Sequence, residues 1–186
     1  MLTGELGMTE GNAYIHGYNL KSQLKKVQQL IGYCPQFDAL VETLTGREML
    51  RMFAQLRGIR GSKVNEIVDN AIDSLDLKQY ADKLCGNYSG GNKRKLSTAM
   101  ALVGNPAVMF LDEPSSGMDP ITRRNLWDTL SDVVASGKSI VLTSHSMEEC
   151  EALCTRLVIM VNGKFKCIGS IQHLKSRFGQ VRLTLV

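Results

Sequence analysis

The sequence contains no apolar segment long enough to cross a lipid bilayer. Its longest unbroken apolar runs, such as Ala107–Leu111 and Leu157–Val161, hold five residues each, whereas a membrane-spanning helix needs about 20. Residues Met1–Gly7 have neither the charged start nor the apolar stretch of a secretory signal. We therefore expect no part of this sequence to span a membrane by itself.

Cysteine is scarce and irregularly spaced. The five cysteines are an odd number without the spacing of a disulfide framework, and neither a CxxC pair nor finger-spaced histidines accompany them. Cys150 and Cys154 lie four residues apart on an expected helix, where the geometry seldom suits a disulfide. The pattern indicates reduced thiols and a cytosolic location, and it does not favour a zinc site.

Positively charged residues only slightly outnumber negatively charged ones. The 22 Lys and Arg residues exceed the 18 Asp and Glu residues by four, and the only dense basic cluster is Lys93–Lys95. This cluster is too short for a nucleic-acid footprint, so we expect it to lie on a solvated helix face and expect no nucleic-acid partner. With 44% hydrophobic and 22% charged residues, disorder as the main state is excluded.

The first half of the chain changes from a mixed pattern to a helical one. We expect a strand at Gly11–His16, a helix at Leu20–Val27 and a strand at Leu30–Tyr33. Thr45 and Glu48 have the spacing of a capping box, which predicts the start of a helix. That helix should carry Met49, Leu50, Phe53 and Leu56 on one face up to Gly58. A second amphipathic helix carries Val64, Ile67, Val68, Ala71, Ile72 and Leu75, and no strand pattern interrupts Thr45–Leu84.

From Gly91 onward, helices alternate with apolar runs. We expect helices at Gly91–Val103, Ile121–Ala135, Met147–Leu153 and Ile171–Phe178, and strands at Ala107–Leu111, Ile140–Thr143, Leu157–Val161, Phe165–Ile168 and Val181–Leu185. The alternation predicts a parallel sheet, and the unbroken apolar runs predict strands buried on both faces. Asn162-Gly163 predicts a tight hairpin turn. At 186 residues, one α/β domain with a helical lobe inserted in it is the expected organisation.

Polar residues follow two of the expected strands. Asp112-Glu113 follows one apolar run, and Ser144-His145 follows another. Ligands of open parallel sheets lie outside the carboxyl ends of the strands. An apolar run closed by Asp-Glu is the Walker B pattern, in which the Asp holds Mg²⁺ and the neighbouring carboxylate takes a proton from water. Taken alone, such a pair more often only solvates a turn.

Tyr88-Ser89-Gly90-Gly91-Asn92 precedes an expected helix. Glycines let a backbone approach a phosphate closely, and a helix N-terminus offers unpaired amides to an anion. By itself this is a common turn. This segment follows an expected helical lobe and precedes the Asp-Glu pair, Ser116–Asp119 and His145. Several motifs in this order are far less probable by chance than any one of them alone.

Taken together, these motifs resemble the ATPase domain of ABC transporters. Four segments are similar in sequence to subfamily A, whose members mostly move lipids: Asn87–Ser97, Leu111–Pro120, Ser144–Leu153 and Gly169–Gly179. The resemblance covers essentially the whole chain. It implies a P-loop NTPase-type α/β fold: a parallel sheet flanked by helices, a helical lobe at about 45–95 and remnants of an antiparallel β subdomain. Residues 170–186 would begin a C-terminal extension.

The resemblance also assigns roles to single residues. Asp112 would be the Mg²⁺ carboxylate and Glu113 the general base, with side chains on opposite sides if both lie on an extended strand. Gln36 would be the glutamine that touches Mg²⁺ and the attacking water; the alternative is a plain loop amide. His145 would be the switch histidine near the γ-phosphate, against the alternative of a structural histidine. Asp119 would lie at a dimer contact, cap its helix, or do both.

Ser89, Gly90, Gly91 and Asn92 would form the signature that faces ATP held by a second domain. Tyr88 and Asn92 depart from the general LSGGQ signature, a departure that subfamily A shares.

A GxxxxGK[ST] phosphate loop does not occur in these 186 residues. The nearest match is Gly137-Lys138-Ser139, but Asp132 stands where the first glycine belongs and the expected order is helix then strand, the reverse of a phosphate loop. Met1–Glu5 resembles the sequence that follows Walker A in subfamily A, so we expect the chain to begin inside the P-loop helix. The aromatic residue that stacks on adenine is likewise expected upstream.

The resemblance therefore predicts an ATPase domain that uses ATP and Mg²⁺ and serves a lipid transporter. Its expected partners are the transmembrane domains, a second nucleotide-binding domain docked head to tail and, through the transmembrane part, a lipid. It would be membrane-associated on the cytosolic face. The alternative is a non-catalytic module that only supplies its signature to a partner. The sequence around Asn92 and Met118 disfavours an ATPase of DNA repair or translation.

Overall fold

The computed structural model describes residues 1–178, which divide into two compact units. The first unit is Met1–Thr143 and the second begins at Ser144. The expected strand Val181–Leu185 lies outside the described residues, and the domain boundaries expected from the sequence stay a prediction.

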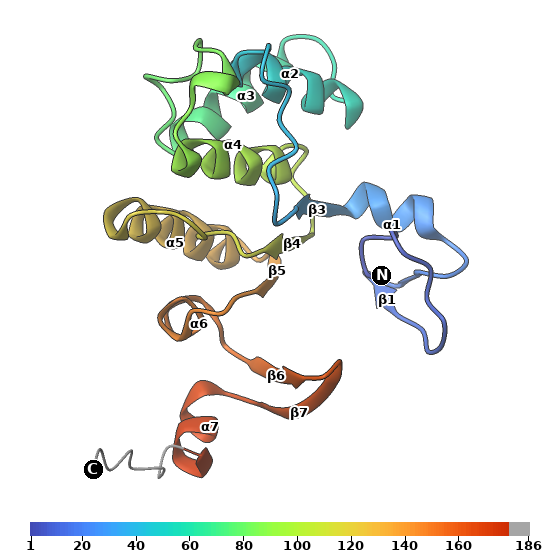
Figure 1. Cartoon of the computed structure of the whole chain (residues 1–186). Helices are drawn as coiled ribbons and strands as arrows, with labels where there is room; N and C mark the ends of the chain where they lie inside the picture. Colours follow the sequence, from blue (N-terminus) through green and yellow to red (C-terminus); the bar gives the residue numbers. More distant parts are fainter. Residues whose placement is uncertain (179–186) are drawn as a thin grey trace. The chain divides into compact units, whose positions relative to one another are not determined.

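A three-stranded parallel sheet forms the centre of the first unit (Figure 1). Its strands are β3 (Ile31–Cys34), β4 (Val108–Asp112) and β5 (Ser139–Thr143), hydrogen-bonded in that order. Gly32 pairs with Met109, and Met109 pairs with Ile140. The three strands lie within one residue of their expected positions, so the α/β fold with a parallel sheet is confirmed.

Burial differs between the strands of the sheet. The middle strand, β4, is buried as expected, with Met109 0% and Leu111 2% exposed. The edge strand, β5, was expected to be buried on both faces, but this is wrong: alternate residues face outward and Val141 is 48% exposed. Helix α5 (Pro120–Ala135), which joins these two strands, buries Leu126 and Leu130.

The N-terminal region forms a small hairpin. Strands β1 (Tyr14–Ile15) and β2 (Tyr18–Asn19) are antiparallel, and the turn residues His16 and Gly17 both have positive φ, 52° and 83°. Such a turn suits a two-residue hairpin. The expected strand Gly11–His16 is therefore shorter than predicted, and β2 was missed. The pair agrees with the expected remnant of an antiparallel β part.

The first helix begins later than the apolar pattern indicated. Helix α1 spans Leu24–Leu30 rather than Leu20–Val27. The Asn19 side chain accepts hydrogen bonds from the amides of Lys21 (2.8 Å) and Ser22 (3.2 Å). This local turn competes with helix formation, so the chain enters the helix only after it.

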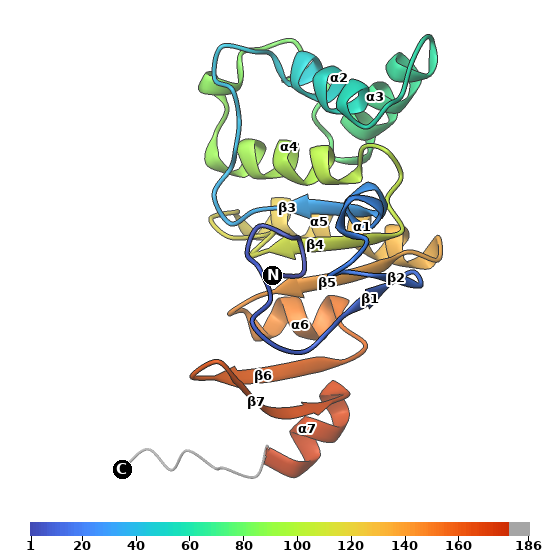
Figure 2. The same ribbon diagram turned by 90° about the vertical axis from the view of Figure 1, so that its right-hand side faces the viewer.

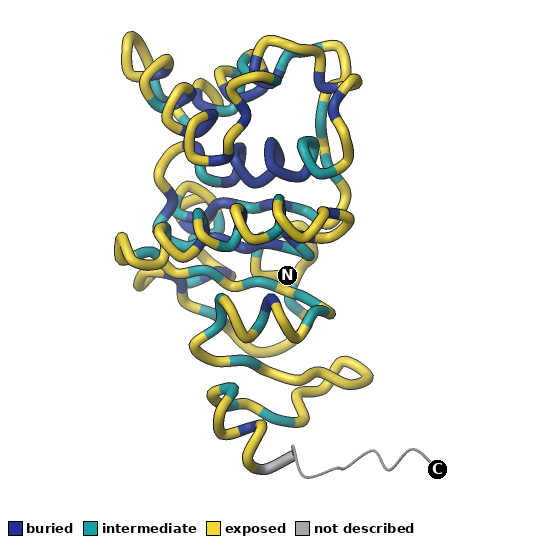
Figure 3. Tube along the Cα trace, turned by 90° about the vertical axis from the view of Figure 1, so that its left-hand side faces the viewer, coloured by how far each residue is buried: buried dark blue, intermediate teal, exposed yellow. Residues whose placement is uncertain are grey.

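Three helices pack against one another in the helical lobe (Figure 2): α2 (Gly46–Leu56), α3 (Lys63–Ser74) and α4 (Gly90–Leu102). A short 3-10 turn, Cys85–Asn87, precedes α4. The capping box is confirmed: the Glu48 amide donates to the Thr45 hydroxyl (3.2 Å), and the Thr45 amide donates to the Glu48 carboxylate (2.8 Å). Figure 3 shows that burial is densest along α4 and the strands beneath it.

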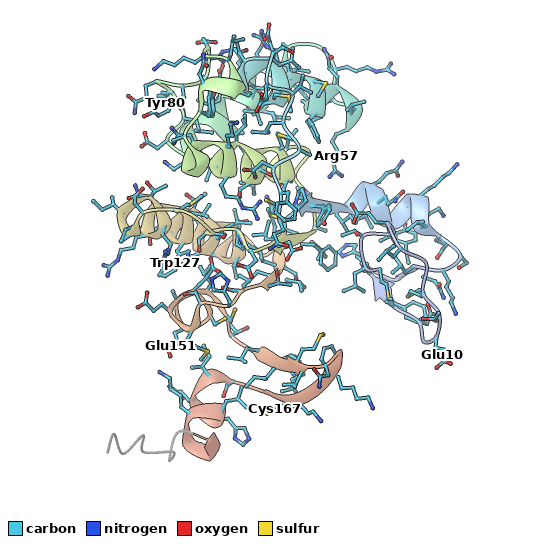
Figure 4. The ribbon with its side chains drawn as sticks, in the orientation of Figure 1. Glu10, Arg57, Tyr80, Trp127, Glu151 and Cys167 are labelled. Atoms are coloured by element: carbon cyan, nitrogen blue, oxygen red, sulfur yellow. The ribbon has the colours of Figure 1, made fainter. Side chains whose placement is uncertain are left out.

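Helix α2 buries a narrower stripe than the sequence indicated. Met49, Leu50 and Ala54 are fully buried, but Leu56 is 74% exposed because it lies at the edge of the stripe in the last turn. The next residue, Arg57, donates to the carbonyls of Ile31 (2.6 Å) and Gln28 (3.2 Å) and so ties the end of the lobe to the start of β3 (Figure 4).

The second unit contains α6 (Met147–Leu153), β6 (Leu157–Val161), β7 (Lys164–Gly169) and α7 (Ile171–Phe178). Strands β6 and β7 form the expected hairpin around Asn162 and Gly163. The expectation that β6 is a buried strand of the parallel sheet is wrong: Met160 is 58% exposed and, within residues 1–178, β6 pairs only with β7. The two-residue turn imposes antiparallel pairing with β7.

Within the described part of the chain, no helix combines the length and the apolar character needed to cross a membrane. The five cysteines are all free thiols. Cys34 lies fully buried beneath α4, with its sulfur 3.4 Å from the Ser97 hydroxyl, and burial raises its pKa.

Candidate functional site

The carboxyl end of β4 presents two adjacent carboxylates. Asp112 is the last residue of the strand, and its carboxylate accepts a hydrogen bond from the Thr143 hydroxyl at the end of β5. The Glu113 amide donates to the carbonyl (3.1 Å) and the hydroxyl (3.2 Å) of the same threonine. Strand β5 therefore holds both members of the Asp-Glu pair.

Glu113 does not continue the strand. Its φ of 52° lies in the left-handed region, which costs a residue other than glycine about 1–2 kcal/mol. The condition for opposite side chains, that Asp112 and Glu113 both lie on an extended strand, is therefore not met. The chain turns at Glu113, so the direction of its side chain does not follow from strand alternation.

The basic cluster of α4 is not a solvated helix face, contrary to the sequence interpretation. Arg94 is 3% and Lys95 5% exposed. Lys93 alone of the three extends outward, where its ammonium lies 3.1 Å from the Glu42 carboxylate. Because α4 is buried along 94–101, a charge on this part of the helix must find partners inside the protein.

Arg94 finds those partners on two separate segments. Its Nε donates to the Pro114 carbonyl (3.3 Å), its Nη2 to the Asp112 carbonyl, and its Nη1 to the carbonyls of Pro35 and Gln36 (3.3 Å to Gln36) and to the Asp38 carboxylate (3.1 Å). The loop after β3 and the turn after β4 are thereby joined through one buried guanidinium.

The backbone of Gln36 is thus linked through Arg94 to the Asp112–Glu113 turn. Its backbone carbonyl is fixed by Arg94, while the residue itself is exposed. The role of its amide toward Mg²⁺ stays a prediction. Sequence reasoning missed Arg94, although the apolar and small residues that follow it, Leu96–Val103, could have indicated that this part of the helix is buried.

The N-terminus of α4 is open. Ser89 caps the helix by accepting a hydrogen bond from the Asn92 amide (3.3 Å), and both Ser89 and Gly90 are exposed. A Cβ built on Gly90 would meet nothing within 4 Å, whereas one on Gly91 would lie 3.9 Å from Met118 and from Thr122. The positive end of a helix with open space at its first residue suits an anion.

Tyr88, immediately before this helix, is an anchor in the lobe. Its hydroxyl donates to the Tyr80 carbonyl (2.7 Å), and burial raises its pKa to about 12. Gly46 packs directly against it, because a Cβ there would lie 2.2 Å from the Tyr88 oxygen. Tyr88, one of the two residues that depart from the general signature, therefore fixes the turn before α4 to the lobe. Its partner Tyr80 is labelled in Figure 4.

Asp119 caps α5, as one of its two sequence interpretations predicted. Its carboxylate accepts a hydrogen bond from the Thr122 amide (3.0 Å). Hydrogen bonding by Thr122, through its side chain first and its amide second, holds the pKa of Asp119 below the usual value. A dimer contact at Asp119 stays a prediction.

His145 lies in the second unit, two residues beyond the end of β5 and just before α6. It is exposed, and the neighbouring Ser146 amide donates to the Ser144 hydroxyl (3.0 Å). The grouping of His145 with Asp112 and Glu113 stays a prediction.

The oxygen atoms at the end of the sheet fit a magnesium ion that also binds phosphate. Mg²⁺ is usually held by one or two carboxylates together with substrate phosphates and water. Asp112 and the Thr143 hydroxyl supply hard oxygen atoms at one end of the sheet, and Glu113 is the next residue. No cluster of three or more His, Cys, Asp or Glu residues suited to a metal ion occurs within residues 1–178. The arrangement therefore suits a shared ion rather than a cage built only of protein.

Comparison with known proteins gives a consistent result. The sequence model of the ABC transporter family matches residues 1–116. The chain is 63% identical to a phospholipid-transporting ATPase, ABCA3, of Mus musculus over 179 residues, which are 96% of this chain and 10% of that protein. Its identity to ATP-binding cassette sub-family A member 2 of Homo sapiens is 58%, covering 96% of this chain and 7% of that protein. The chain thus spans about a tenth or less of these relatives.

Solved structures agree on the fold. The ATP-binding subunit of an ABC transporter superposes with a TM-score of 0.84 at 26% identity, over 96% of this chain and 74% of that one. The ATP-binding cassette MJ0796, a dimer in a post-hydrolysis state with ADP and Pi, superposes with a TM-score of 0.82 at 20% identity, over 90% of this chain and 76% of that one. The parallel sheet with its flanking helices is therefore the ABC ATPase fold.

Proposed function

The chain belongs to the ABC transporter family, and on that premise we propose that it works within the nucleotide-binding domain of a subfamily A transporter. There, ATP binding and hydrolysis would drive the movement of a lipid. The 63% identity to a phospholipid-transporting ATPase supports both the subfamily and the class of substrate.

The observation that carries this proposal is the gathering of the Asp112–Glu113 turn and the Gln36 loop around Arg94. Asp112, with Gln36, would hold Mg²⁺, which when bound neutralises the charge that develops on the transferred phosphoryl group. Glu113 would accept the proton of the attacking water.

The open end of α4 would act on a second nucleotide-binding domain. In a head-to-tail pair, the Ser89 side chain, the amides of Gly90 and Gly91 and the helix dipole would face a γ-phosphate bound by the partner, with Asn92 behind them. Asp119 would lie at the contact between the two domains, and His145 near the γ-phosphate. The partner domain, the transmembrane domains and the lipid would then be the molecules with which this chain works, at the cytosolic face of a membrane.

A second candidate is a non-catalytic module that lends only its signature to a partner domain. It is favoured by the exposure of Ser89 and the open space at Gly90, since this surface depends on none of the groups at the end of β4.

The two candidates differ in the effect of Glu113. We would replace the matching 179 residues of the Mus musculus relative with this chain and measure ATP turnover. Glu113→Gln should keep ATP binding and slow hydrolysis by about 10²-fold or more, as the loss of a general base does. Asp112→Asn should instead raise the Mg²⁺ concentration needed for turnover.

Glu42→Gln is the matched control, because Glu42 is an exposed carboxylate that pairs with Lys93 on the lobe. It should leave turnover unchanged within about twofold. Normal hydrolysis by the Glu113→Gln protein would refute the assignment of the base. If only the signature residues affected turnover, the non-catalytic module would be the better description.

A further inference from the structure

A single arginine inside the first unit joins the two segments that the proposed function needs. Arg94 is 3% exposed, and its guanidinium reaches five acceptors, four of them backbone carbonyls. Two carbonyls belong to the turn after β4, and the other three acceptors belong to residues 35–38. A planar guanidinium carries five N–H donors in a fixed fork spread over three nitrogens, whereas an ammonium group carries three donors on a single nitrogen.

The turn after β4 is pinned on both sides of Glu113. The carbonyl before it, of Asp112, and the carbonyl after it, of Pro114, both accept hydrogen bonds from Arg94. Its own amide donates to Thr143. A left-handed conformation at a residue other than glycine persists only where the surroundings over-determine it. At Glu113, with a φ of 52°, these hydrogen bonds supply that constraint.

The remaining hydrogen bonds hold the loop that carries Gln36. Nη1 of Arg94 binds the carbonyls of Pro35 and Gln36 and pairs with Asp38 at 3.1 Å. The separation of the Gln36 loop from Glu113 is therefore set by the size of one rigid group, and a movement of either segment has to displace that group.

We propose that Arg94 is a positioning residue for hydrolysis: it keeps Glu113 in its left-handed conformation and fixes the Gln36 loop against it. The role in hydrolysis rests on the proposed function, whereas the joining of the two segments does not. Arg94 touches neither reacting group; it acts through the backbone on either side of Glu113. Hydrogen exchange tests the joining of the two segments, and ATP turnover tests the role in hydrolysis.

The first measurement is amide hydrogen exchange on the 186-residue chain. Arg94→Lys keeps the charge but loses the fork, so exchange should rise about tenfold or more at the amides of residues 36–38 and of residues 112, 113, 115 and 116 together and stay unchanged in α2 and α3. Lys93→Met, which removes a charge from the same turn of α4 and breaks only the contact with Glu42, should change neither segment. No change at both segments, or an equal rise throughout the chain, would overturn the proposal.

The second measurement is ATP turnover in the hybrid transporter described above. Arg94→Lys should lower kcat about tenfold or more and change the KM for ATP by less than about threefold, because misplacing a catalytic group affects the chemical step. Asp38→Asn, which leaves the four carbonyl contacts in place and keeps an oxygen that can accept from Nη1, should lose less than about threefold. Equal losses in the two variants would place the effect in the ion pair and refute the role of the carbonyl contacts. A hybrid that never turns over ATP would refute the proposed function, and the exchange experiment would still decide the joining of the segments.

Discussion

The end of β4 and the start of α4 are both assigned to the nucleotide by their sequence, but the protein holds them in opposite ways. At the end of β4, Asp112 and Glu113 are tied by Thr143 and, through the backbone, by Arg94. At the start of α4, Ser89 and Gly90 are exposed and a Cβ on Gly90 would touch nothing.

On the proposed function, the groups at the end of β4 would be prearranged, whereas those at the start of α4 would become ordered around a ligand. Hydrogen bonds fixed before the reaction cost no rearrangement during it, which suits a general base and a metal carboxylate. An uncovered helix N-terminus has no internal anion, so its favourable partner has to come from outside the unit. We therefore expect substitutions at the two segments to impair ATP turnover in different ways.

The largest effect is expected at the open segment. In the hybrid transporter, Gly90→Asp should lower ATP turnover about 10²-fold or more, because it adds negative charge and bulk where a phosphate would bind. The free space around Gly90 means that the same change should leave the melting temperature within about 2 °C. Turnover and thermal unfolding of the same preparation test both statements.

A glycine in a packed place provides the control for Gly90→Asp. Gly46→Ala would put a Cβ 2.2 Å from the Tyr88 hydroxyl oxygen, so it should destabilise the fold by about 1–3 kcal/mol, as overpacking does. If Gly90→Asp also destabilised the fold, or if it left turnover normal, the open end of α4 would have no role in binding phosphate.

A smaller effect is expected at the closed segment. Thr143→Val removes the hydroxyl that donates to the Asp112 carboxylate. Residues that orient a metal ligand are worth about 10–100-fold in metal affinity or activity, so the Mg²⁺ concentration for half-maximal turnover should rise about tenfold. Thr143→Ser keeps the hydroxyl and is the matched control. An unchanged Mg²⁺ requirement in the valine variant would remove Asp112 from the metal site.

Local patterns in the sequence predicted most of the first unit. The capping box at Thr45 and Glu48 and the apolar run of β4 depend on neighbours in the chain, and both were confirmed. In the second unit, the turn residues Asn162-Gly163 predicted the β6–β7 hairpin in the same way.

Two kinds of feature could not be predicted locally. The apolar runs of β4 and β6 are alike, yet Met109 is 0% and Met160 58% exposed, because burial depends on what packs against a strand. The burial of Arg94 depends on acceptors 18 to 59 residues away, and no spacing within α4 indicates them. A helix with apolar residues on every side is the only local sign that a charge within it is buried.

A still smaller effect is expected from pH at the start of α5. Because the folded pKa of Asp119 lies below its unfolded value of 3.8, its charged form stabilises the fold at pH above about 4, and this contribution is lost as the pH falls through the folded pKa. Asparagine also caps helices but does not titrate. Asp119→Asn should therefore reduce the fall in melting temperature between about pH 5 and pH 3 by no more than a few degrees. An identical pH profile in both proteins would contradict the capping assignment.

The smallest effect is expected from adding Mg-ATP to the 186-residue chain alone. The amides and lysine of a GxxxxGK[ST] loop supply most of the groups that bind the phosphates, and no such loop occurs in these residues. Gly137-Lys138-Ser139 cannot replace it, since Gly137 ends the turn after α5 and Ser139 begins β5. The open end of α4 would face a phosphate that another domain already holds. A complete site at 100 times its Kd would stabilise the fold by about 2.7 kcal/mol, or roughly 5–10 °C. For this chain the shift in melting temperature should stay below about 1 °C, and a rise of several degrees would show that the chain binds the nucleotide without that loop.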